Sequence, residues 1–230
     1  MIEVKKYQLP PTALVPNSPK PLLYYPAFFK ESDCTPSNAY EVLDSNGWQV
    51  RWLARYGPNQ QSHYHSAAHE CMVVLSGSAK ILFGVADLGG EDSGQEEGGV
   101  LLEANMGDVF VLPAGLAHKT HEATPPAEVL RLSPGDGHNV SDEEMRVAMG
   151  NVQLSGFTML GAYPRHGSDW DFSVGGDSKG KYDQVWSVPN PENDPVLGKS
   201  ECGQIQSRYR SQPVPGSVPR FSFGPPLESS

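Results

Sequence analysis

Proline and glycine interrupt this sequence so often that little room is left for long helices. The 230 residues include 21 prolines and 24 glycines, and short apolar runs lie between them. Apolar runs of about four to eight residues between turn signals are typical of strands with a buried face. We therefore predict an all-β protein, with strands at residues 48–56, 71–77, 79–86, 108–115, 128–132 and 156–163.

The chain length suits one β domain, because sandwiches and barrels often exceed about 200 residues as a single unit. We predict one barrel over residues 26–200, with a Pro-rich arm at 1–25 and a Pro/Ser-rich arm at 201–230. Residues 86–99 are acidic and Gly-rich, so we expect a solvated insertion there. Ser141 as an N-cap and Glu144 three residues later predict one short helix over 141–150.

The charge balance excludes several partners. A formal net charge of −10 without a run of Lys or Arg disfavours nucleic acids and anionic membranes. No stretch approaches the roughly 18 apolar residues of a membrane span, and the start lacks the apolar region of a signal peptide. We expect a cytoplasmic protein with a small-molecule substrate. Cys34, Cys71 and Cys202 share no metal-ligand spacing and should be free thiols, with Cys71 in the core.

Apolar residues in the two arms need a sheet on which to dock. Docking on a neighbouring copy would also cover an exposed strand edge, so we expect a homodimer. The competing hypothesis is that the arms pack on their own barrel. The residues concerned are Leu22, Leu23, Tyr24, Tyr25, Phe221 and Phe223.

Metal-ligand residue types gather in two stretches, GPNQQSHYHSAAHECMVVLSG (57–77) and GDVFVLPAGLAH (107–118). His63 and His65 are two residues apart, so on a strand both imidazoles project from one face. Glu70 comes after room for a turn and can face them. His118 comes after a Pro-x-Gly corner and is the fourth candidate. These residues predict a metal site.

Written as G-x5-H-x-H-x4-E-x6-G and G-x5-P-x-G-x2-H, the two stretches resemble the signature motifs of the cupin superfamily. The resemblance implies a double-stranded β-helix, a jelly-roll barrel of two antiparallel sheets. It also implies one divalent transition metal per chain, held by three histidines and one glutamate; Fe, Mn, Ni, Co and Zn all suit such ligands. The family's second motif continues to an Asn, where this chain has Glu122, so the role of that Asn is not carried over.

Further stretches resemble a narrower group, the YjlB-like single-domain cupins. They are PNSPKPLLYYPAF, HYHSAAHE, GSAKILFG, PAGLAHK and GAYPRHGSDWDF. The likeness extends over residues 15–200, interrupted by the acidic insertion and by residues 133–155. It implies a fold and a site, and leaves the substrate open.

Several residues near the predicted ligands have both a functional and a structural interpretation. On a regular strand Glu122 shares the parity of His118, so it is a candidate acceptor or base beside the metal, or else a solvated carboxylate. His69 and His121 are out of parity and should face away from the metal. Tyr163, His166 and Trp170 either close the barrel mouth or lie outside. The residues predicted to line a substrate pocket are Trp52, Tyr56, Met72, Val74, Tyr163, His166 and Trp170.

A metal with open positions in an apolar barrel is compatible with two classes of function. The first is an enzyme acting on a small organic substrate, foremost an Fe(II)-type dioxygenase or other oxidoreductase, and next a redox-neutral isomerase, decarboxylase or lyase. The second is a non-catalytic ligand-binding or storage-type cupin. We favour the enzyme, because storage cupins resemble two tandem barrels that often lack ligands, whereas this chain has one barrel with all four.

Overall fold

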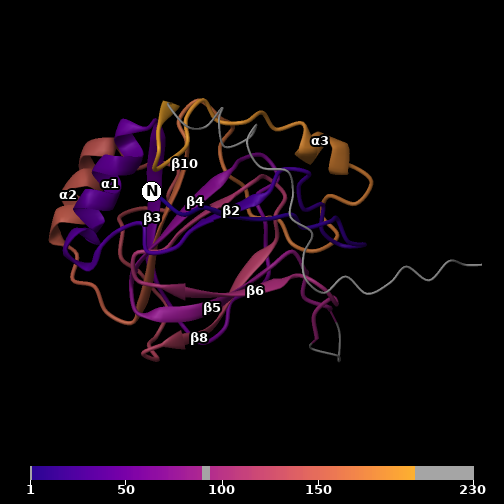
Figure 1. Ribbon diagram of the computed structural model, residues 1–230, viewed down its shortest axis with the longest axis horizontal. Coiled ribbons are helices and arrows are strands. Elements are labelled where there is room, and N and C mark those ends of the chain that lie inside the picture. Colours follow the sequence, from indigo (N-terminus) through magenta and orange to yellow (C-terminus); the bar gives the residue numbers. More distant parts are fainter. Residues whose placement is uncertain (1, 90–93, 200–230) are drawn as a thin grey trace, which may run out of the picture.

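Two antiparallel sheets pack together to form the barrel (Figure 1). The computed structural model describes residues 2–89 and 94–199. Within these residues, the larger sheet has seven strands in the order β1-β2-β7-β4-β10-β3-β9 and the smaller has three in the order β6-β5-β8. The predicted all-β barrel is confirmed. The larger sheet contains β1 (Lys5–Tyr7), β2 (Leu22–Tyr25), β3 (Trp48–Tyr56), β4 (Glu70–Ser76), β7 (Val109–Leu112), β9 (Leu130–Arg131) and β10 (Phe157–Pro164). The smaller sheet contains β5 (Ser78–Phe83), β6 (Val100–Asn105) and β8 (His118–Thr124).

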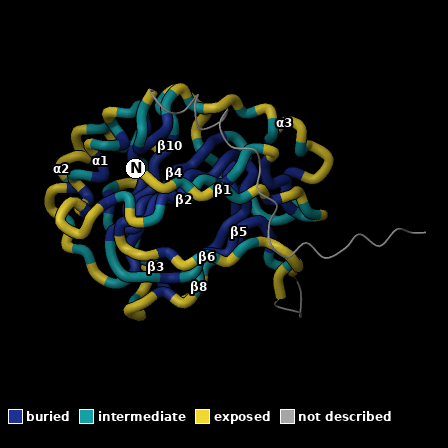
Figure 2. The backbone as a smooth tube through the Cα atoms, in the orientation of Figure 1, coloured by how far each residue is buried: buried dark blue, intermediate teal, exposed yellow. Residues whose placement is uncertain are grey.

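Strand β4 shows why the apolar runs of this chain are continuous. Cys71, Val73 and Leu75 pack on the helix side of the larger sheet. Met72 and Val74 point the other way, into the barrel core. Both faces of the sheet are covered here, so every residue of β4 except the last one, Ser76, is buried. Figure 2 shows the same burial along the central strands. Cys71 lies in the core as predicted.

Two helices, α1 (Pro36–Ser45) and α2 (Asp142–Asn151), lie side by side against the outer face of the larger sheet at β3 (Figure 1). Helix α2 is the predicted helix: the Ser141 side chain accepts from the Glu144 N–H, and the Glu144 carboxylate accepts from the Ser141 N–H. Helix α1 and the short α3 (Tyr182–Trp186) were not predicted. The local signals for α1 are Thr35 as N-cap and Pro36 at the first position.

No helix within the described ranges is both long enough and apolar enough to cross a membrane.

The N-terminal arm docks on its own barrel. Strand β1 pairs with β2, and β2 pairs with β7 of the larger sheet. Leu22 and Tyr25 are buried there, at 1% and 0% exposure. This segment therefore needs no neighbouring copy to cover its apolar residues, and the homodimer remains a prediction. The C-terminal arm at 201–230, with Phe221 and Phe223, and Cys202 lie outside the described residues.

The acidic insertion is attached to the barrel where its ends are described. Asp87 pairs with Gln95 in an isolated bridge. The Glu96 carboxylate accepts hydrogen bonds from the Thr12 hydroxyl at 2.7 Å and from the Ala86 N–H at 3.0 Å. Most of the described residues of this segment are exposed, while the Glu96 carboxylate joins the insertion to the N-terminal segment. Residues 90–93 lie outside the described part.

Candidate metal centre

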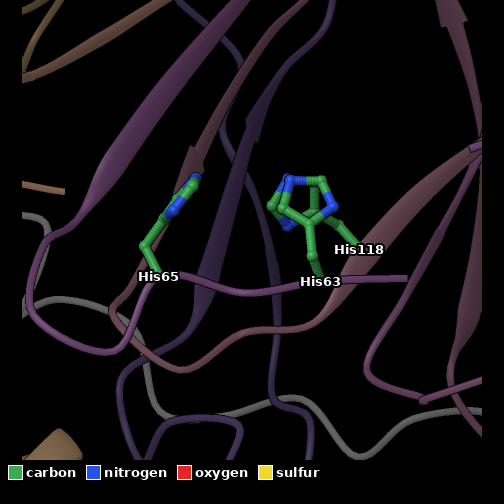
Figure 3. Close-up of side chains that lie close together, drawn as sticks. All are labelled: His63, His65 and His118. Carbon is green, nitrogen blue, oxygen red and sulfur yellow. The ribbon is translucent and has the colours of Figure 1, made fainter. Parts of the chain in front are cut away.

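Three imidazoles predicted from the two motifs meet in the protein interior. Figure 3 shows His63 and His65 rising from one stretch of chain and His118 from another, towards a common region. Each contributes one ring nitrogen to a cluster whose atoms all lie within 4.8 Å of one another. The exposed fractions of the three residues are 6%, 5% and 4%. The fold thus brings together, away from water, the histidines that the sequence spacing selected.

Backbone pairing sets this geometry. The His63 N–H donates to the His118 carbonyl at 3.2 Å, and the His118 N–H donates back to the His63 carbonyl at 2.9 Å. The Gly115 N–H donates to the His65 carbonyl at 2.8 Å. Gly115 has φ +88°, and a Cβ there would lie 2.8 Å from the Asn17 carbonyl oxygen. Only glycine suits this turn, which explains its place in the second motif.

Backbone carbonyls orient all three rings through Nδ1. The partners are the carbonyl oxygens of Gln61 for His63 (3.1 Å), Leu116 for His118 (3.2 Å) and Asp171 for His65. A carbonyl oxygen only accepts, so we assign the ring proton to Nδ1 in each case. The lone pair is then on Nε2, the form of histidine that a metal ion binds.

Of the two oxygens of the Glu70 carboxylate, one accepts hydrogen bonds and the other has no hydrogen-bond partner among the described residues. Oε1 accepts from the Tyr163 hydroxyl at 2.6 Å and from Trp52 Nε1 at 3.3 Å. Oε2 is buried without a hydrogen-bond partner among the described residues, and it lies 3.4 Å from His118 Nε2. Leaving such an oxygen unpaired is costly. A cation fits this position, because it would satisfy Oε2 and the imidazole lone pairs together.

Burial and mutual contact perturb the pKa values of these groups. Burial, followed by the charges of His118 and His65, lowers the pKa of His63 to about 3. Burial also lowers the pKa of His118. Burial alone would raise the pKa of Glu70, but His65, His118 and the Tyr163 hydroxyl hold it well below its usual range. Burial opposes protonation of His65 too, yet the Glu70 carboxylate raises its pKa. The centre therefore favours an ionised carboxylate and neutral rings at His63 and His118, the states required for metal binding.

Asp171 fixes the segment that carries His65. Its carbonyl accepts from His65 Nδ1, and its carboxylate accepts from the N–H groups of Ser66 at 2.7 Å and Ala67 at 3.1 Å. Sequence analysis did not select Asp171. The available signal was an acid between two aromatic residues in GSDWDF, but its partner is 106 positions away in the chain.

The residues on either side of Asp171 cover the imidazoles. The Trp170 ring lies 5.7 Å from the His65 ring and stacks on Tyr163 at 5.6 Å with an interplanar angle of 9°. The Phe172 ring stacks on His63 at 4.4 Å and 11°. The sequence left Trp170 either at the barrel mouth or outside, and it did not select Phe172.

Most of the predicted pocket residues lie in one inner cluster, and His166 does not. The cluster includes Trp52, Met72, Val74 and Tyr163, with Tyr56 and Trp170 packed against it. His166 is exposed and lines a separate cavity of about 480 Å³ with Trp48 and His69. Its place in that cavity sets it apart from the residues that border the three imidazoles.

Glu122 lies on the surface, so of its two interpretations the role beside the metal is wrong and the solvated carboxylate is the one observed. Its side chain is 68% exposed and pairs with Lys80 at 2.7 Å. The parity argument assumed a regular strand, but the β5–β8 register shifts between Ser78 and Lys80, and Glu122 has φ +52°. His69 faces away from the centre as expected: its Nδ1 accepts from the Ala114 N–H, and its Nε2 donates to the Pro189 carbonyl.

Comparison with known proteins gives a family match and one curated relative. Residues 53–147 match the family model described as Cupin. The chain is 27% identical over 202 residues to the protein YjlB of Bacillus subtilis (strain 168), in an alignment that covers 86% of this chain and 93% of that protein.

Solved structures with some similarity are vicilin from Corylus avellana (hazelnut), with 12% identity and a TM-score of 0.27, and a formate complex of oxalate decarboxylase from Lactobacillus farciminis, with 14% identity and a TM-score of 0.28. These alignments cover 63% and 54% of this chain but only 28% and 27% of the other two. The barrel, the match over residues 53–147 and the similarity to YjlB over most of both chains agree: this chain contains a cupin domain and is similar to YjlB.

Proposed function

We propose that the protein is a metal-dependent enzyme with one divalent transition metal per chain, bound by Nε2 of His63, His65 and His118 and by Oε2 of Glu70. The observation that carries this proposal is the unpaired Oε2 beside three rings whose Nδ1 atoms are already engaged. Three imidazoles and a carboxylate suit Fe, Mn, Ni, Co or Zn and leave coordination positions for a small organic substrate.

Among the reactions open to such a site, we favour those of an Fe(II)-type dioxygenase or related oxidoreductase. Bound Fe(II) would supply redox chemistry with dioxygen, which none of the four ligand side chains provides. The alternatives are a redox-neutral isomerase, decarboxylase or lyase at the same site, and a protein that only binds its ligand.

Tyr163 is a positioning residue in this proposal. Burial, and then the Glu70 carboxylate, raise the pKa of Tyr163 well above its ordinary value, so its hydroxyl keeps its proton. That proton is donated to Glu70 Oε1, while the hydroxyl oxygen of Tyr163 accepts from Trp52 Nε1 at 3.1 Å. Glu70 is thereby pinned through Oε1, which leaves Oε2 directed to the histidines.

Trp170 offers an unused donor at the same site. The indole N–H groups of Trp48, Trp52 and Trp186 all donate to oxygen atoms. Trp170 Nε1 is buried and has no partner within residues 2–89 and 94–199. A buried N–H without an acceptor is costly, and a substrate oxygen would satisfy it. This supports organic acids and phenols as the first substrates to test.

Metal content is the first test. Protein purified without a polyhistidine tag or chelator should contain about one transition-metal ion per chain by elemental analysis, because preorganised imidazoles and a carboxylate bind such ions tightly. His63→Ala, His65→Ala and His118→Ala should each lose most of it. His121→Ala is the matched control, since this half-buried histidine lies three residues beyond His118 and is not a member of the cluster of three imidazoles. Metal-free wild-type protein that added metal cannot load would refute the proposal.

Oxygen uptake is the second test. Fe(II)-loaded protein should consume O2 with at least one member of a panel of organic acids and phenols, and His118→Ala should not. Product formation without O2 consumption would instead support the redox-neutral alternative. Saturable binding without any product would support the ligand-binding alternative.

A further inference from the structure

Three aromatic side chains border the imidazoles, and they differ in their freedom to move. Tyr163 is 4% exposed, and its hydroxyl donates a hydrogen bond to Glu70 Oε1. Trp170 is stacked between Tyr163 and His138, at centroid distances of 5.6 and 4.4 Å. Phe172 is 55% exposed, and within the described chain its ring contact is with His63. Phe172 is therefore the ring that can leave the site at the least cost.

The backbone around Phe172 is held in place on both sides. The Asp171 carboxylate accepts from the Ser173 hydroxyl at 2.6 Å and from the Ser66 N–H at 2.7 Å. Ser173 exchanges two backbone hydrogen bonds with Tyr64, at 2.8 and 2.9 Å. Opening at this point is thus a rotation of one exposed side chain, a motion on the picosecond to nanosecond scale, and does not require the segment to unfold.

The contact between Phe172 and His63 is flat. The ring lies almost parallel to the His63 imidazole, with centroids 4.4 Å apart and an angle of 11°. When the ring rotates away, it uncovers one flat face of the His63 imidazole. A conjugated, planar ligand can replace the lost stacking contact, whereas a ligand with tetrahedral centres cannot.

We propose that Phe172 is the gate to the metal centre and selects planar, conjugated ligands, with aromatic carboxylates as the chemical class. This inference rests on the proposed metal site, because it concerns how a ligand reaches a metal held by His63.

Chelators of different shape test the gate without any assay of turnover. Co(II)-loaded protein is mixed with excess dipicolinate, which is planar, or nitrilotriacetate, which is not, and loss of cobalt is followed by absorbance at several chelator concentrations. Dipicolinate should remove cobalt from the wild-type protein faster than nitrilotriacetate does, at a rate that depends on chelator concentration. Phe172→Ala should accelerate extraction by nitrilotriacetate roughly tenfold, the rate equivalent of losing a favourable stacked pair, and so abolish the preference.

Two further variants separate gating from loss of stability. Phe172→Trp keeps a flat ring over His63 and should retain the preference for dipicolinate. Phe28→Ala removes a half-buried ring that contacts Tyr25 and Phe29, outside the centre, and should leave both rates unchanged. Cobalt-loaded Phe172→Ala that behaves like wild type would overturn the gate alone. Failure of the wild-type protein to load cobalt, or any other transition metal, would overturn the gate and the metal site together.

Discussion

Replacing Tyr163 by Phe removes one buried hydroxyl beside Glu70 in the candidate metal centre and leaves the ring in place. The hydroxyl makes a 2.6 Å hydrogen bond to Glu70 Oε1, whose residue is 2% exposed. The phenyl ring can keep its stacking on Trp170. The substitution therefore removes the buried, charge-assisted hydrogen bond to Glu70, together with the contacts of the hydroxyl with Trp52 Nε1 at 3.1 Å and His65 Nε2 at 3.2 Å.

The size of the effect depends on the donors that remain. A hydrogen bond to a charged group contributes about 1.5–3 kcal/mol. Trp52 Nε1 still reaches Oε1 at 3.3 Å, so the carboxylate keeps one donor. We expect Tyr163→Phe to lower the free energy of unfolding of the metal-free protein by about 2 kcal/mol, equivalent to roughly 4–8 °C in Tm for a domain of this size. Because Glu70 is then less well oriented, metal affinity should fall about tenfold or more.

Urea unfolding of the metal-free protein and metal titration measure the two effects. Tyr40→Phe is the matched control: its hydroxyl donates at 3.1 Å to the Asp142 backbone carbonyl, a neutral acceptor, so its loss should cost about 1 kcal/mol and leave metal affinity unchanged. If Tyr163→Phe cost no more than Tyr40→Phe and bound metal as wild type does, the argument that Tyr163 positions Glu70 would be wrong.

Three further predictions concern other contacts. Glu96→Ala should lower stability in urea by about 1–2 kcal/mol, because its carboxylate accepts from the Thr12 hydroxyl and from a backbone N–H. Burial, followed by a nearby lysine, lowers the pKa of His69 to about 4, so the unfolded chain binds a proton that the folded protein excludes. Stability should therefore fall as pH drops from about 6.5 towards 4, and His69→Asn, which keeps an acceptor for the Ala114 N–H but does not titrate, should reduce that slope in urea titrations. Trp170→Ala should weaken substrate binding or turnover while elemental analysis shows the metal retained, since Trp170 covers the centre without supplying a ligand.

Features that depend on local geometry could be predicted from the amino-acid sequence. Side chains alternate along a strand, so the spacing of His63 and His65 was sufficient to place both imidazoles on one side. The same rule put Glu70 on the face of Met72 and Val74, and all three point inward from β4. A capping box predicted α2 because its two hydrogen bonds join residues only three positions apart.

The same parity rule misplaced Glu122, and the reason is tertiary. The strand that carries it pairs with β5 through a register shift, which depends on the partner strand and leaves no mark in the spacing of residues along β8. The N-terminal arm is a similar case. Its apolar residues showed that it must dock, but the pairing of β2 with β7 decided that it docks on its own barrel.

The surroundings of the metal ligands depend on how the whole chain folds. Asp171 reaches His65 across 106 positions, and Tyr163 reaches Glu70 across 93. The first contact exists only once the loop after β10 has folded over the barrel, and the second only once β10 has paired with β4, so no local pattern encodes them. The sequence could therefore name the residues able to bind a metal, because ligand chemistry and alternation are local. It left Tyr163 and Trp170 either at the barrel mouth or outside and missed Asp171 and Phe172, because the residues that orient and cover the ligands are selected by how distant segments pack.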